Sequence, residues 1–360
     1  MNRRTLTATG TAALLACGWA SSASAATKTV DVGGHGFKGA PQNLEALAFL
    51  RQTVSVHVGD SVNFRLRPGL IHTVTFVPPG QSAPHFDGLD PAHPLAGVTD
   101  AVGMPFWFNG QPRPIINPVA AFPTTGHTVT GKAYVNSGTP ANPAKGETYP
   151  LKFARTGTFR FICVVHPGMT GFVKVLPRSA RIPTAAQDAA AAKRELATIV
   201  KQATAKAKVP VGAGQVDVGR TGPRFSISAM FPGKTTVKVG QTVTFTMAGQ
   251  SRVEIHTVTF GPPTVTTAIE NSFVTPLPNA MGPPTLTVNP LAAFPSDPPP
   301  KLAPYTGANH GNGFLNSGIL DNDPATPPPG STTVTFAKPG TYHFECVIHA
   351  HMDGTMVVTA

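Results

Sequence analysis

Four blocks of sequence occur twice in the same order, and this repetition constrains the fold more than any other feature. The first block, Ile-His-Thr-Val-Thr-Phe, stands at 71–76 and again at 255–260. The other three pairs are 117–123 with 289–295, 136–138 with 316–318, and 157–166 with 340–349. Their offsets lie between 172 and 184 residues, which indicates a duplicated domain rather than a solenoid. A chain of 360 residues is long enough for two domains with separate cores.

Within each copy, short segments show the alternation of apolar and polar residues that is typical of strands. In the first copy, 53–58 and 61–66 alternate in this way and meet at Gly59, which favours a tight turn between them. In the second copy, 235–239 and 242–246 repeat the arrangement. The chain also has 38 Pro, 36 Gly and only 12% charged residues, which favours strands and turns over helix bundles. We therefore predict an all-β fold with one antiparallel β-sandwich per copy.

Each copy carries a long insertion without a clear pattern, at 78–130 and at 261–313. Loops of this length are uncommon in a compact domain unless they cover a functional surface. The apolar run Met-Pro-Phe-Trp-Phe at 104–108 is expected to pack the first insertion onto the sandwich. The alternative is an exposed docking patch near the functional site.

The segment between the copies has the pattern of a helix. Thr184 follows a proline and has Gln187 three residues later, which is a capping box. An apolar face follows, formed by Leu196, Ile199, Val200 and Ala203. This helix is either a semi-rigid spacer or an element that packs on a domain. The predicted organisation is a leader at 1–25, a first domain at 27–178, a helical linker at 179–211 and a second domain at 212–360.

The first residues have the pattern of a signal peptide. Arg3 and Arg4 precede an apolar stretch at about 6–19, and Ala-Ser-Ala at 23–25 fits a cleavage site. We therefore expect an exported protein that is periplasmic, at the cell surface or secreted. A lipid anchor at Cys17 is the alternative reading of this segment. No later segment is long and apolar enough to predict a membrane span.

Removal of the leader leaves two cysteines, Cys163 and Cys346, which stand in equivalent settings. A disulfide framework in an exported protein would normally use more cysteines. Each Cys begins the motif Cys-x-x-His-x-x-Met, with His166 and Met169 in the first copy. The second copy has His349 and Met352 at the same spacing. These two cysteines are therefore interpreted as thiolates that serve chemistry.

A further His stands upstream in each repeat, His72 in the first and His256 in the second. One thiolate, two imidazoles and one thioether form the ligand set of blue-copper electron-transfer sites. Zinc would more usually gather further Cys or His and leave Met out. The sequence thus predicts two type 1 copper ions per chain. The alternative is a pair of metal-free cores with buried Cys, Met and His.

This arrangement resembles the plastocyanin/azurin family, the cupredoxins, with an amicyanin-like ligand loop. The resemblance implies a Greek-key β-sandwich for each copy. It also implies that the copper ligands are His72, Cys163, His166 and Met169, and again His256, Cys346, His349 and Met352. The separation between the first His and the Cys is 91 and 90 residues here. This is longer than in small members of the family, so the loops around the copper are expected to differ.

The function that these features predict is one-electron transfer with redox partner proteins that the sequence does not identify. Two-domain copper oxidoreductases, such as nitrite reductases and multicopper oxidases, join two kinds of copper through a His beside the Cys. Here Ile162 and Val164 flank Cys163, and Glu345 and Val347 flank Cys346, so we do not predict an enzyme. Copper storage or delivery is the third alternative. No motif indicates binding of nucleic acid, although the formal charge is +11.

The second motif has more ionisable neighbours than the first. His343 and His351 flank it, and Glu345 precedes the Cys. His351 is expected to face solvent, and Glu345 is expected to point away from the metal because it lies on the opposite strand face. Different surroundings for similar ligand sets predict two different redox potentials.

Overall fold

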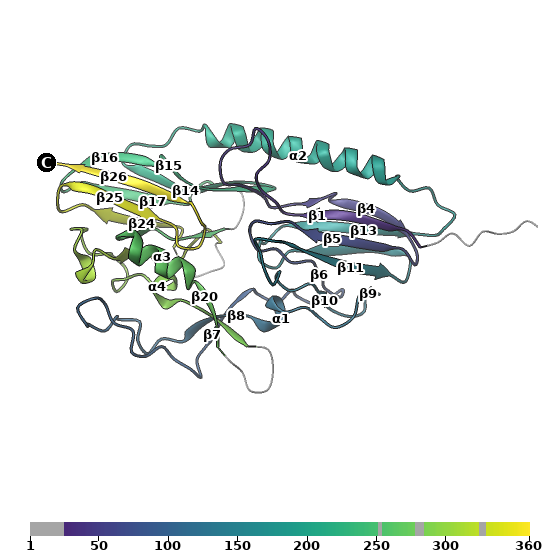
Figure 1. Cartoon of the computed structure of the whole chain (residues 1–360), viewed down its shortest axis with the longest axis horizontal. Helices are drawn as coiled ribbons and strands as arrows, with labels where there is room; N and C mark the ends of the chain where they lie inside the picture. The colour runs from purple at the N-terminus through teal and green to yellow at the C-terminus, as the bar shows by residue number, and fades with distance from the viewer. Residues whose placement is uncertain (1–24, 251–253, 278–283, 324–328) are drawn as a thin grey trace, which may run out of the picture.

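The computed structural model describes residues 25–250, 254–277, 284–323 and 329–360. Figure 1 shows two β-sandwiches side by side, with the helix α2 (Ala185–Ala207) running along both and a small sheet on the opposite side. The prediction of an all-β protein with two sandwiches and a mostly helical linker is confirmed. Within the part of the chain that the structure describes, no helix has the length and hydropathy needed to cross a membrane. The predicted leader and Cys17 lie outside the described residues.

The first sandwich consists of two five-stranded sheets. One has the order β3 (Phe49–Leu50), β1 (Thr27–Val32), β5 (Ser61–Leu66), β11 (Glu147–Phe153) and β9 (Thr128–Val129). The other has the order β10 (Val135–Asn136), β6 (Thr75–Phe76), β12 (Gly157–Ile162), β13 (Thr170–Leu176) and β4 (Thr53–His57). Phe64 and Phe161 meet edge to face between the sheets with ring centroids 5.0 Å apart. The alternating residues of the strands thus form one closed core.

The second sandwich repeats this plan. One sheet has the order β2 (Leu44–Ala46), β15 (Phe225–Phe231), β14 (Gln215–Gly222), β17 (Thr242–Thr246) and β24 (Ser331–Thr335). The other has the order β16 (Lys234–Lys238), β26 (Asp353–Thr359), β25 (Gly340–Glu345), β19 (Thr259–Phe260) and β22 (Leu315–Asn316). A short pair, β18 (Ile255–His256) with β23 (Leu320–Asp321), lies beside them. Phe245, Phe260 and Phe344 fill its core as their counterparts do in the first copy.

The tight turn predicted at Gly59 is present, with the amide of Asp60 donating to the carbonyl of His57 at 3.0 Å, but the two strands that it joins do not pair with each other. Strands β4 and β5 lie in different sheets, where β4 pairs with β13 and β5 pairs with β1 and β11. Gly59, with φ at 89°, turns the chain from one sheet to the other. Alternation determines which residues face the core, and both strands face the same core, but it does not determine the partner of a strand.

Helix α2 begins after Thr184, as predicted, and the capping box with Gln187 is present. Its buried residues Ile199 and Ala203 lie in one apolar cluster with Leu44 and Leu50 of the first copy and Phe225 of the second. Its Asp188 also binds two cations of the first copy, Lys28 at 2.6 Å and Arg51 at 3.0 Å. The helix is therefore an element that packs on both copies rather than a free spacer.

One strand of the first copy completes a sheet of the second. Strand β2 pairs antiparallel with β15, and Glu45 is the partner of Ser226. Glu45 and Ser226 are equivalent positions of the two copies. Glu45 stands four residues before Phe49, which pairs with Val32 of the first copy. Ser226 stands four residues before Met230, which pairs with Val218, the counterpart of Val32 in the second copy. Equivalent residues that oppose each other in an antiparallel pair lie on a local two-fold axis.

The two insertions meet on the same axis. They contain β7 (Asp87–Asp90), β8 (Arg113–Ile116), β20 (Val274–Leu277) and β21 (Thr285–Val288), together with α1 (Pro118–Ala121), α3 (Pro263–Asn271), α4 (Pro290–Ala293) and a 3₁₀ turn at Asn309–Gly311. The strands form a four-stranded sheet in the order β20, β21, β8, β7, visible at the bottom of Figure 1. In its centre Ile115 opposes Thr287, again an equivalent pair. The two copies therefore face each other like the subunits of a symmetric dimer.

The apolar run of the first insertion packs onto the second copy. Phe108 is fully buried and stacks on Phe294 with a centroid distance of 5.2 Å. Trp107 Nε1 donates to the carbonyl of Pro295 at 2.9 Å. Met104 is 63% exposed. The run is thus packed rather than a free docking patch, but it packs against the second insertion, to which Phe294 and Pro295 belong, and not onto the sandwich of its own copy.

Candidate metal centres

The first cluster of candidate ligands lies at one end of the first sandwich. Cys163 follows the last residue of β12, His166 lies in the loop to β13, and His72 stands three residues before β6. The Sγ of Cys163 is 3.8 Å from Nδ1 of His72 and 3.7 Å from Nδ1 of His166, and the two nitrogens are 3.1 Å apart. All three side chains are buried. Three donor atoms thus converge on one point that a single ion could occupy.

The second cluster repeats these distances. The Sγ of Cys346 is 3.8 Å from Nδ1 of His256 and 3.6 Å from Nδ1 of His349, and the nitrogens are 3.0 Å apart. Each corresponding distance agrees with the first cluster to 0.1 Å. His256 is the last residue of the short strand β18, whereas His72 lies outside a strand, three residues before β6.

Each Met of the motif closes the loop that begins at the Cys. The amide of Cys163 donates to the carbonyl of Met169 at 3.0 Å, and the amide of Met169 donates to the carbonyl of His166 at 3.1 Å. Met352 makes the equivalent bonds at 2.9 and 3.2 Å. Both Met side chains are buried in the apolar cluster that contains the Cys of their own copy. The role of Met169 and Met352 as fourth ligands stays a prediction.

The Thr after the first His supports the thiolate in both copies. The amide of Thr73 donates to Sγ of Cys163 at 3.4 Å, and that of Thr257 donates to Sγ of Cys346 at 3.3 Å. The Thr73 hydroxyl accepts the amide of Val164 at 2.9 Å. The repeated His-Thr sequence therefore fixes the ends of two strands around the sulfur.

A buried Asn explains the two remaining repeated blocks. Asn136 Oδ1 accepts from the Thr75 hydroxyl at 2.8 Å. Its Nδ2 donates to carbonyls in and after α1, those of Val119, Ala120 and Phe122. Asn316 makes the same bonds to the segment around α4. The blocks that recur in the sequence are thus the parts that hold each insertion against the short strand that follows the first His.

The ionisation of the cysteines suits binding of a cation. Burial raises the pKa of the Cys163 thiol, but hydrogen bonds with His166 and His72 and the charges of both rings hold this pKa well below 9.0. Burial also raises the pKa of the Cys346 thiol, but the hydrogen bond and charge of His349, together with the amides of Thr257 and Ile348, hold this pKa below 9.0. A buried thiolate with two imidazoles fits a soft or borderline metal ion. The residues present therefore fit copper.

The two centres differ behind the first His. His72 Nε2 donates to Oε1 of Glu45 at 3.2 Å, whereas His256 Nε2 has no hydrogen-bond partner within the described ranges. Burial lowers the pKa of His72, but its bonds with Cys163 and Glu45 raise it to about 9. Burial and the charge of His349 place the pKa of His256 well below 6.5. Sequence reasoning missed Glu45, because no motif or spacing connects it with His72.

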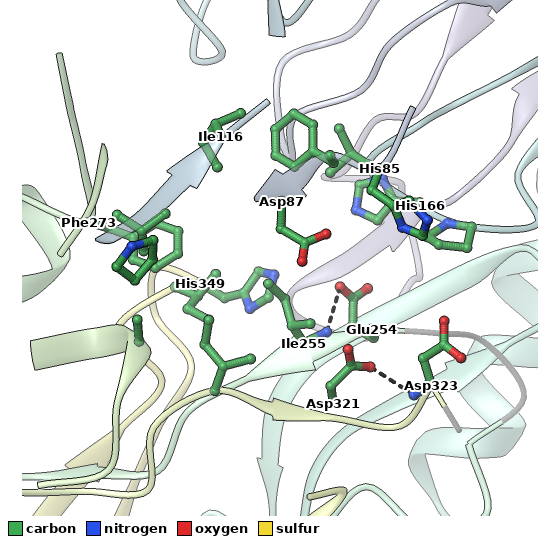
Figure 2. Close-up of a pocket in the computed structure, with 18 of the residues that line it drawn as sticks. His85, Asp87, Ile116, His166, Glu254, Ile255, Phe273, Asp321, Asp323 and His349 are labelled. Carbon is green, nitrogen blue, oxygen red and sulfur yellow. Dashed lines mark hydrogen bonds between the residues drawn. The ribbon is translucent and has the colours of Figure 1, made fainter. Parts of the chain in front are cut away.

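Both ligand loops line one cavity between the copies. The cavity has a volume of about 1560 Å³, and His166 and His349 both form part of its wall. Figure 2 shows these two residues approaching the pocket from different sides, with Asp87 and Ile255 between them. Much of the remaining wall is apolar and includes Ile116 and Phe273 from the two insertions. The insertions thus enclose the space onto which both centres open.

The other ionisable residues near the second motif do not join the cluster. His351 is exposed, as expected, and its carbonyl accepts Nδ2 of Asn43 at 2.8 Å. Glu345 Oε2 lies 3.3 Å from His343 Nε2. Among the described residues, the two Cys/His clusters are the groups of three or more potential ligands that lie close enough to hold one ion.

The chain was compared with known protein families, curated sequences and solved structures, and it is similar to several solved structures. No protein-family model matches the chain, and neither does any curated protein sequence. The chain is similar to a variant of amicyanin with Cu(I), with 18% identity over 42% of this chain and 82% of that chain and a TM-score of 0.22. A mutant fern plastocyanin shows 19% identity over 40% of this chain and 99% of that chain, with a TM-score of 0.22. Dithionite-reduced auracyanin from the photosynthetic bacterium Roseiflexus castenholzii shows 21% identity over 41% and 95%, with a TM-score of 0.23.

Proposed function

We propose that this chain is an exported electron carrier that binds two type 1 copper ions, one in each copy. The observation that carries the proposal is the pair of buried clusters, each with one thiolate and two imidazole nitrogens at matching distances. Met169 and Met352 would complete the two ligand sets from the same loops. Bound copper would supply a one-electron couple between Cu(I) and Cu(II).

The surroundings of each cluster favour electron transfer over hand-over of the metal. The ligands are buried, and the Thr and Asn bonds fix the strands on both sides of the sulfur. A site that is held in this way can change charge with little movement of its ligands. Storage or delivery of copper would instead gain from ligands that are open to exchange.

An enzymatic role is the second candidate, and the cavity is the observation that favours it. A space of about 1560 Å³ beside His166 and His349 could admit a small substrate. However, the residues on both sides of each Cys are not His, so the sequence lacks the link that joins a blue copper to a catalytic copper. We therefore infer a carrier that works with redox partner proteins.

Export rests on the leader pattern and on where the fold begins. Strand β1 starts at Thr27, and the amide of Ala26 donates to Asp60 at 3.0 Å. The predicted cleavage after Ala25 would thus leave the first strand intact.

A reversible redox titration of the copper-loaded chain, combined with turnover assays, tests this function. We expect each copper to cycle through one electron and the loaded protein to reduce nitrite and oxidise phenols no faster than free copper. Turnover above that control would favour the enzyme. Rapid loss of copper to a weak chelator would favour storage or delivery.

A further inference from the structure

The two candidate centres have the same distances between their Cys and His ligands. They differ in one buried contact, which lies behind the first His. In the first centre, the carboxylate of Glu45 stands behind His72. Glu45 is only 3% exposed, and its Oε1 also accepts the amide of Gly34 at 2.6 Å. The carboxylate is therefore fixed in place rather than free to turn away.

The second centre has no such carboxylate at the equivalent position. Ser226 opposes Glu45 across the local two-fold axis. Its hydroxyl and Nε2 of His256 are both buried without a hydrogen-bond partner in the described part of the chain. Equivalent positions of the paired strands β2 and β15 thus carry a carboxylate in the first copy and only a short hydroxyl in the second.

A hydrogen bond from a ligand imidazole to a carboxylate makes the imidazole a stronger donor to the metal. A stronger imidazole donor stabilises Cu(II) relative to Cu(I), and this lowers the reduction potential of the copper. We propose that Glu45 gives the first centre the lower potential, so that electrons pass within the chain from the first centre to the second. This inference rests on the proposed binding of two copper ions. With copper held by both ligand sets, one electron would leave Cu(I) in the first centre, giving Cu(II), and would reduce Cu(II) in the second centre to Cu(I).

The same strand provides a connection between the centres. Asn43 lies two residues before Glu45, and its Nδ2 donates to the carbonyl of His351 at 2.8 Å. His351 lies between His349 and Met352 in the second ligand loop. A path of covalent bonds and two hydrogen bonds therefore runs from the ring of His72 through Glu45 and Asn43 to the second ligand loop.

A carboxylate near the second centre opposes this order. Glu254 is buried and stands two residues before His256, where the first copy has Leu70. Its Oε1 accepts the amide of Ile255 at 3.3 Å, and neither of its oxygens bonds a ligand ring among the described residues. A carboxylate bonded directly to a ligand acts more strongly than one acting through space, so the contact of Glu45 decides the order.

Potentials of chains with one centre each test the proposal. In the full chain, Cys346→Ser leaves the first centre and Cys163→Ser leaves the second, and each is titrated by its visible absorption after copper loading. We expect the reduction potential of the first centre to be lower than that of the second by about 59 mV or more. For one electron, this difference corresponds to a tenfold equilibrium constant for transfer to the second centre. Glu45→Gln keeps a side chain of the same shape and removes the charge. It should raise the first potential by about the same amount and change the second much less.

The matched control is Glu147→Gln, which removes an exposed carboxylate of the same half that accepts the amide of Ala141 at 3.4 Å. This control should leave both potentials nearly unchanged. The exchange variant Glu45→Ser with Ser226→Glu should reverse the order, and it tests the same point if Glu45→Gln does not fold. Equal potentials, a lower second potential or equal shifts of both centres in Glu45→Gln would overturn the proposal. Failure of the proposed function looks different, because neither single-centre chain would then show a copper absorption band.

Discussion

At the scale of single residues, the space behind each first His depends on a glycine. Gly33 and Gly219 have φ at 67° and 73°, a region that other residues rarely adopt. A Cβ at Gly33 would lie 2.2 Å from Nε2 of His72, and one at Gly219 would lie 2.4 Å from Nε2 of His256. Each imidazole therefore occupies room that only glycine leaves.

We predict that Gly33→Ala displaces His72 and removes the first copper centre while the second remains. The control is Gly36→Ala, which has a similar φ of 70° but no atom within 4 Å of the added Cβ. Both variants bear the backbone cost of about 1–2 kcal/mol for a left-handed residue. Copper content and visible absorption distinguish them. If Gly33→Ala keeps two full centres, the packing of glycine against His72 does not position the ligand.

The sequence predicts the candidate ligand residues better than it predicts the residues that hydrogen-bond to them. The repeated spacing of Cys163 and His166, with His72 upstream, is sufficient to expect the cluster that the structure brings together. Glu45 could not be predicted, because it reaches His72 only through a strand that pairs with the other copy. A contact that depends on how distant strands pair does not produce a recognisable motif in the sequence.

At the scale of elements, the first insertion packs against the second copy next to its candidate metal centre. Phe106 and Phe108 share an apolar cluster with Val347, the residue after Cys346. His310 of the second copy lies beside this apolar cluster. Its Nδ1 is 3.5 Å from Asp100 of the first insertion, and its Nε2 is 3.7 Å from Asp297. The insertion of one copy thus helps to hold the ligand loop of the other.

We predict that Phe108→Ala lowers the free energy of unfolding by about 3–5 kcal/mol, the usual cost of removing a buried phenyl ring. Met104→Ala in the same insertion removes an exposed side chain and should cost less than about 0.5 kcal/mol. Denaturant unfolding measures both, and amide hydrogen exchange should rise over 95–110 in Phe108→Ala. Equal stability of the two variants would contradict the packing described here.

A second prediction at this scale concerns pH. The nearby carboxylate of Asp297, together with that of Asp100, raises the pKa of His310 against the effect of burial. A pKa that is raised in the folded state gives stability that is complete below the ordinary value of 6.5 and is lost as the pH rises through the raised value. The melting temperature of the parent should therefore exceed that of His310→Gln most at acidic pH. A difference that stays constant from pH 5.5 to 9 would show that the charge of His310 plays no part.

The strands themselves follow from the sequence, but their partners do not. Residues 61–66 form β5 over the predicted range, and 53–57 form β4. The turn between them is present, but their pairing could not be predicted, because strands of two facing sheets satisfy the burial of alternate residues equally well. The insertions had no period to interpret, and their sheet forms only when β8 meets β21 of the other copy.

At the scale of the whole molecule, the chain is a duplicated unit folded back onto itself. The pairs β2 with β15 and β8 with β21 both oppose equivalent residues, and helix α2 packs on both copies. The arrangement turns both ligand loops toward one cavity. The boundaries at 27–178 and 212–360 stay predictions of where each domain begins and ends.

We predict that the two halves, produced separately at these boundaries, are each less stable than the parent and associate when mixed. Each half alone would expose an unpaired strand edge and the apolar face that the other half covers. Size-exclusion chromatography and denaturant unfolding of each half, alone and mixed, measure this. Two monomeric halves that unfold like the parent would mean that the contacts between the copies add little.

The central claim is that each His/Cys/His cluster holds one type 1 copper, and copper titration followed by visible absorption tests it most directly. The account predicts an intense blue thiolate band that saturates at two copper ions per chain. Cys163→Ser and Cys346→Ser should each lose one ion together with its share of the band. The absence of such a band in the parent, or its survival when both cysteines are replaced, would contradict the claim.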